Sequence, residues 1–80
     1  MSFFSSKKIF NTSQQIKDAL FRLQNLDSQQ RQSVFSALVK ELDDGGVSAE
    51  EIKRVARELR EKNEISEIDK NELLQIISGN

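Results

Sequence analysis

Residues 43–52 read DDGGVSAEEI, and this stretch decides how the chain divides into helices. Two acids and two glycines end one amphipathic segment, and one of the glycines can adopt the positive φ angle that follows many helices. Ser48 and Glu51 then form a capping box, in which the two side chains accept hydrogen bonds from free amides at a helix start. Val47 and Ile52 flank the box as a hydrophobic staple. The stretch therefore predicts a tight joint between two helices.

The apolar residues on both sides of this joint predict an all-α fold. They recur at i, i+3, i+4 and i+7, the spacing that gives a helix one hydrophobic face, and no proline interrupts the chain. We predict a small single-domain bundle of four short helices with tight joints, at about 13–26, 28–42, 49–62 and 69–78. The residues expected to face its core are Ile16, Ala19, Leu20, Leu23, Leu26, Val34, Phe35, Leu38, Val39, Leu42, Ile52, Val55, Ala56, Leu59, Leu73, Ile76 and Ile77.

Helix starts and stops can also be assigned to particular residues. The cap pattern around Ser48 recurs at Asp27 and Asp69, 21 residues before and after it, with Gln or Glu three positions later. Ser66 is an alternative cap for the last helix. Asn63 is suited to the left-handed residue that ends the third helix.

The N-terminal segment is separate from the predicted bundle. Thr12, with Gln15 three residues later, caps the first helix, so residues 12–80 form the helical domain. Residues 1–11 then form either a tail or a short helix that packs on the bundle.

Phenylalanine is concentrated in and near the N-terminal segment. Phe3, Phe4 and Phe10 are three of the five phenylalanines, and Phe21 lies outside the apolar stripe of the first helix. Exposed aromatic residues often anchor protein interfaces. We therefore predict that these four residues bind a partner. The alternative is that those of the N-terminal segment cover the open end of the core.

The composition excludes several classes of function. The chain has no His, Cys or Tyr, so the usual general bases and nucleophiles are missing, and we expect no enzyme. Zinc, haem and iron–sulfur sites lack their usual ligands, and we expect no cofactor or metal. No run of residues is apolar enough to span a membrane, and the N-terminus lacks the pattern of a secretory signal. We expect a cytoplasmic protein.

The residues from Asp44 onward resemble the second half of an EF-hand calcium loop. The glycine, the apolar residue after it, the serine and Glu51 occupy the matching positions. Counted backwards, the first two ligand positions fall on Lys40 and Leu42. Neither side chain can coordinate a cation, so calcium binding is not expected.

The sequence G46-V-S-x-x-x-I52-x-x-V55 resembles the turn and recognition helix of the helix-turn-helix family. The resemblance implies a DNA-binding regulator whose third helix presents Lys53, Arg54, Arg57 and Arg60 to DNA. Acidic residues at 43, 44, 50 and 51 crowd the same end and would repel phosphates. Leu42 also stands where that family has a small residue.

The joint and the following cap also resemble tellurite-resistance-type helical domains. The shared features are D44-G-G-V-S-A-E-E51 and I65-S-E-I-D69, within a likeness of about 35 residues. This chain is shorter than such domains and has an extra glycine. The resemblance implies an interaction-type helical module.

The leading hypothesis is a non-enzymatic interaction or regulatory module that works through a protein partner or self-association. Charge is uneven, with a net of +3 in residues 1–42 and −4 in residues 43–80. The basic flank of the third helix is either a solvated face or a secondary polar surface. Nucleic acid, bound by that helix, is the alternative partner.

Overall fold

The computed structural model describes residues 8–78 of the chain. This part of the protein forms a small bundle of four α-helices, as predicted, with a short 3-10 turn and a minimal two-stranded sheet. The elements in chain order are β1 (Lys8–Phe10), α1 (Ser13–Phe21), α2 (Ser28–Lys40), η1 (Glu41–Asp44), β2 (Val47–Ser48), α3 (Ala49–Glu61) and α4 (Glu67–Ser78).

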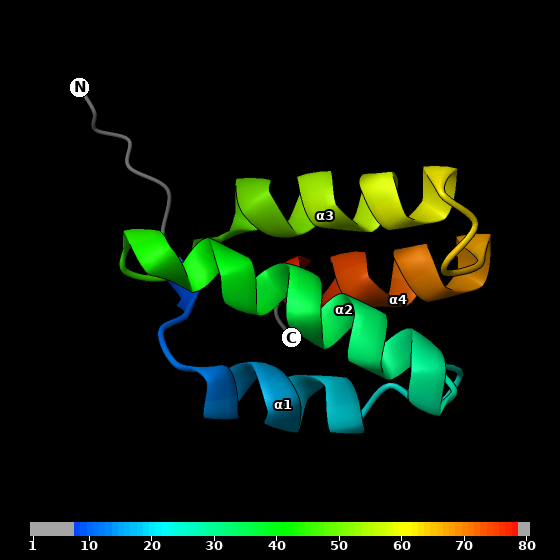
Figure 1. Ribbon diagram of the computed structural model, residues 1–80, viewed down its shortest axis with the longest axis horizontal. Helices are drawn as coiled ribbons and strands as arrows, with labels where there is room; N and C mark the ends of the chain where they lie inside the picture. Colours follow the sequence, from blue (N-terminus) through cyan, green and yellow to red (C-terminus); the bar gives the residue numbers. More distant parts are fainter. Residues whose placement is uncertain (1–7, 79–80) are drawn as a thin grey trace.

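The helices are arranged around α2. This helix packs against α1 on one side and α3 on the other, and α4 folds back along α3 (Figure 1). Among the described residues, no helix is long and apolar enough to cross a membrane.

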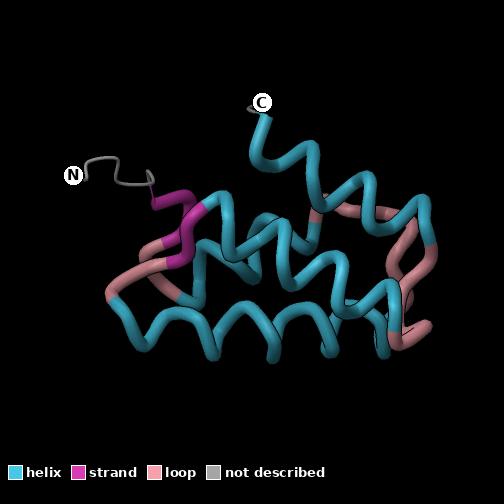
Figure 2. Tube along the Cα trace, turned by 90° about the horizontal axis from the view of Figure 1, so that it is seen from above, coloured by secondary structure: helices cyan, strands magenta, loops and turns pink. Residues whose placement is uncertain are grey.

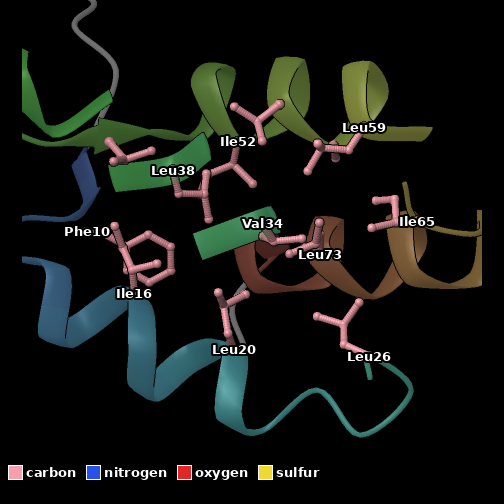
Figure 3. Close-up of a cluster of buried hydrophobic side chains, with 13 residues drawn as sticks. Phe10, Ile16, Leu20, Leu26, Val34, Leu38, Ile52, Leu59, Ile65 and Leu73 are labelled. Atoms are coloured by element: carbon pink, nitrogen blue, oxygen red, sulfur yellow. The ribbon is translucent and has the colours of Figure 1, made fainter. Parts of the chain in front are cut away.

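The core is built from the apolar stripes that the sequence predicts. Buried side chains from all four helices meet between α1 and α3 (Figure 3). Four residues outside the helices complete this core: Phe10, Leu26, Val47 and Ile65. The buried apolar residues are Phe10, Ile16, Leu20, Leu26, Val34, Leu38, Val47, Ile52, Val55, Ala56, Leu59, Ile65 and Leu73. Other predicted members, such as Ala19, Leu23 and Phe35, are partly buried at the margin.

Capping boxes start the helices at the predicted places. Thr12, Asp27 and Ser48 each accept a hydrogen bond from the backbone three residues later, and each box is reciprocal. The last helix starts earlier than residue 69. There the backbone amide of Asp69 donates to Ser66 Oγ at 3.1 Å, and Asp69 Oδ2 accepts from the Ser66 amide at 3.0 Å. Of the two candidate caps, Ser66 is used, and this choice buries the Asp69 carboxylate.

The first helix is shorter than predicted, because it ends at Phe21 instead of residue 26. Residues 22–27 form turns that bring Leu26 into the core. An unbroken helix would leave no chain to reverse direction before α2 begins at Ser28. Carbonyl groups at this early end and in the following turns accept hydrogen bonds from a side chain of α2, as described below.

Helix α3 ends in the left-handed conformation predicted for Asn63, whose φ is 63°. The amide of Glu64 donates to the Leu59 carbonyl at 2.9 Å, and that of Asn63 donates to the Arg60 carbonyl at 3.1 Å. This pair of bonds is a Schellman motif, which ends the helix and turns the chain toward α4.

The described part of the N-terminal segment is a strand, so neither a tail nor a short helix describes residues 8–10 correctly. Strand β1 pairs antiparallel with β2, with Lys8 opposite Ser48 and Phe10 opposite Val47 (Figure 2). Val47 and Ser48, the two residues before α3, form the second strand, and Ser48 also caps the helix. The strand also carries the Phe10 ring into the core beside Ile16 (Figure 3).

Candidate functional site

The four phenylalanines predicted to bind a partner do not form one surface. Phe10 is 5% exposed and belongs to the core, so its prediction as a contact residue is wrong and the alternative, a core-covering role, applies to it. Phe21 is 77% exposed, the most exposed large apolar side chain among the described residues. Phe3 and Phe4 lie outside the described residues.

Phe21 borders a groove between α1 and α2 with a volume of about 350 Å³. The groove has an apolar wall, formed by Leu20, Phe21 and Phe35, and a polar rim. Its lining residues are Lys17, Leu20, Phe21, Ser28, Arg31, Gln32 and Phe35. It lies beside the connection between α1 and α2, in which Leu26 is buried in the core.

Arg31 fixes one side of this groove. Its Nε donates to the carbonyl of Leu20 at 3.2 Å, and its Nη2 donates to the carbonyls of Leu23 and Leu26 at 3.0 and 2.9 Å. The same guanidinium lies 6.0 Å from the centre of the Phe21 ring, at the limit of a cation–π interaction. The Arg31 side of the groove is therefore already ordered in the absence of a ligand.

Sequence reasoning did not identify Arg31, although a signal was present. Arg31, Val34 and Leu38 are spaced i, i+3 and i+7, so a cation lies on the apolar stripe of α2. A charged group at such a position must find partners inside the fold. The sequence does not say that these partners are the carbonyls of the preceding turn.

The four basic residues predicted on α3 do not form one surface. Arg54 forms an ion pair with Glu41 at 2.6 Å, and this hydrogen-bonded carboxylate raises the pKa of Arg54. Arg60 pairs with Glu67 of α4 at 3.2 Å. Lys53 and Arg57 instead line a second groove, between α3 and α4.

The exposed face of α3 is balanced in charge. It carries three basic and three acidic side chains: Glu50, Lys53, Arg54, Arg57, Glu58 and Glu61. A helix that binds DNA needs an excess of positive charge facing the phosphates. The turn before α3 is also occupied, because Val47 and Ser48 pair with β1. These features do not favour the helix-turn-helix alternative.

The glycines of the DDGG stretch have conformational roles. Gly45 and Gly46 have φ angles of 89° and 136°. A Cβ atom on Gly46 would lie 3.1 Å from the Phe10 carbonyl oxygen, so the residue lets β1 approach closely. Among the side chains that the structure describes, no group of three or more acidic residues could hold a metal ion.

Comparison with family models, curated proteins and solved structures finds no match to this chain. The resemblances of the joint to known motifs therefore rest on its own residues. The α1–α2 groove, with Phe21 at its edge, is the candidate functional site.

Proposed function

We propose that the protein is a non-catalytic helical interaction module, which binds a protein partner or a second copy of itself through the α1–α2 groove. The observation that carries the proposal is Phe21, which is 77% exposed at the edge of a groove with an apolar wall. The cytoplasmic location and regulatory role expected from the sequence stay predictions.

Binding at this groove would remove water from side chains that are already held in position. Aromatic and arginine side chains dominate the binding energy of protein interfaces when a partner excludes water from them. Here a phenylalanine and an arginine are adjacent, and the three carbonyl bonds of Arg31 limit the side-chain entropy lost on binding. An apolar side chain of the partner would lie against Phe21 and Phe35. A hydrogen-bond acceptor beside it would meet Lys17 or Gln32 at the rim.

The test compares Phe21→Ala with wild type in partner capture from native cell extract, followed by sizing of the complexes. Loss of the Phe21 ring is expected to weaken binding at least about 10-fold, as for a central interface residue. Sedimentation velocity over a range of protein concentrations separates self-association from capture of another protein.

Ile68→Ala is the matched control. Ile68 is the other large apolar side chain that is well exposed among the described residues, at 61%, and it does not line the groove. Both variants should keep wild-type stability, because neither residue is buried. If Phe21→Ala retains every captured protein and the same sedimentation profile as wild type, the proposal is wrong.

A further inference from the structure

A second groove in the described part of the chain lies between α3 and α4 and has a volume of about 380 Å³. Lys53 and Arg57 are four residues apart on α3, so they project from one flank of that helix. Lys70, Leu74 and Ile77, at i, i+4 and i+7, line the groove from α4. Three cations thus surround two aliphatic side chains.

The positive charge of this groove is only partly neutralised. Lys70 forms an ion pair with Glu67 at 2.9 Å. The hydrogen bond from Lys70 lowers the pKa of Glu67. Lys53 lies 4.0 Å from Glu50, at the outer limit of an ion pair, and half of its side chain is exposed. Arg57 has no carboxylate within ion-pair distance among the described side chains. Lys53 and Arg57 can therefore form ion pairs with carboxylates of a binding partner.

We propose that the α3–α4 groove binds an acidic amphipathic helix of a protein partner. The apolar stripe of that helix would cover Leu74 and Ile77, and carboxylates beside the stripe would pair with Lys53 and Arg57. Leu74 and Ile77 are already partly buried against the core, and covering the part that stays exposed supplies the favourable free energy. The two cations set the orientation and select acidic sequences.

The surroundings of the groove favour a peptide over the other polyanions. A nucleic acid backbone would place phosphates above Leu74 and Ile77, where they gain nothing from the apolar surface. Glu50 and Glu61 are exposed on the same helix as Lys53 and Arg57, and they would repel a densely charged backbone or an anionic membrane. An amphipathic peptide meets less of this repulsion, because it can carry carboxylates only where they face Lys53 and Arg57 and apolar residues elsewhere.

This groove is independent of the site proposed above. The two grooves share no lining residue and belong to different pairs of helices. A failure at one groove therefore leaves the other proposal unaffected.

The test uses the full chain and a synthetic helical peptide with leucine along one stripe and glutamate beside it. Amide chemical-shift mapping should place the largest changes at the residues that line the groove: Lys53, Arg57, Lys70, Leu74 and Ile77. The affinity should fall as salt is added, because salt screens the exposed ion pairs. The double variant Lys53→Glu/Arg57→Glu should bind at least about 10-fold more weakly, since both attractive charges become repulsive.

The double variant Lys40→Glu/Lys62→Glu is the matched control. It changes the net charge equally, and its two exposed lysines line neither groove, so it should bind the peptide like wild type. A peptide with lysine in place of glutamate should not bind.

Three results would overturn the proposal. The first is equal binding of the acidic peptide by both double variants, and the second is the absence of any shift at the groove. The third is a preference of the same residues for duplex DNA or anionic vesicles over the peptide, which would assign the groove to another class of partner.

Discussion

Two adjacent glycines illustrate how much a single residue controls in this small bundle. Both have positive φ angles, but only Gly46 is also closely packed, since a Cβ there would lie 3.1 Å from the Phe10 carbonyl oxygen. A Cβ on Gly45 would meet no atom within 4 Å. The first glycine is needed only for its backbone conformation, whereas the second is needed for both conformation and space.

Substitution by alanine should separate these two roles. Gly45→Ala should lower the free energy of unfolding by about 1 kcal/mol, the cost of a left-handed conformation for a residue with a Cβ. Gly46→Ala should cost at least about 2 kcal/mol, because strain and a steric conflict with backbone combine. Urea unfolding of both variants measures the difference. Equal losses in the free energy of unfolding would show that β1 shifts to make room for the Cβ of residue 46 without loss of stability.

At the scale of elements, the connection between α1 and α2 depends on a side chain more than on backbone pairing. Arg31 of α2 donates three hydrogen bonds to carbonyls at the end of α1 and in the loop that follows. Such carbonyls otherwise need water or a capping motif. The Arg31 side chain therefore connects α2 to the end of α1 and to the following loop, and it forms one side of the candidate site.

Arg31→Ala should lower the free energy of unfolding by about 2–3 kcal/mol, because three partly buried carbonyls lose a charged donor. Arg31→Lys should recover part of this loss, since an ammonium group can reach fewer of the three oxygens. Arg22→Ala is the control, because Arg22 is a nearby exposed arginine with no side-chain hydrogen bond among the described residues. Thermal unfolding provides the measurement, and equal effects at positions 22 and 31 would contradict the assignment.

At the scale of the whole molecule, the N-terminal strand closes the bundle. Strand β1 pairs with β2, which is far away in the sequence, and the irregular register places Phe10 opposite Val47. The Phe10 ring then fills the core beside Ile16, at the end of the bundle where α2 and α3 are joined (Figure 3). The helical domain expected to begin at Thr12 thus has a core to which an earlier residue contributes.

Phe10→Ala should therefore destabilise the whole fold by about 3–4 kcal/mol, the cost of removing a buried aromatic ring. This is a large share of the stability expected for a chain of this length, so the variant should unfold well below the wild-type midpoint. Phe21→Ala removes the same atoms from an exposed position and should cost under about 0.5 kcal/mol. A similar midpoint for both variants in urea would contradict the core assignment of Phe10.

Local interactions explain why much of the fold could be predicted. A capping box joins residues three positions apart, and a helical stripe joins residues three and four apart, so both can be read directly from the sequence. Thr12, Asp27 and Ser48 therefore cap helices as expected, and Asn63 adopts its left-handed conformation. The start of α4 was ambiguous because Ser66 and Asp69 both fit a cap; the structure uses Ser66 as the cap, and Asp69 completes its capping box.

The sequence by itself determined that there are four helices, which residues cap the first three and which faces are apolar, because each depends on neighbours within about one helical turn. Only the tertiary structure decided that Phe10 is buried while Phe21 is exposed. Strand pairing places the Phe10 ring in the core, whereas Phe21 lies at the end of a helix. It also decided that Lys53 and Arg57 line one groove with Lys70, while Arg54 pairs with Glu41. Both candidate surfaces combine residues from different helices, and helix packing brings those residues together.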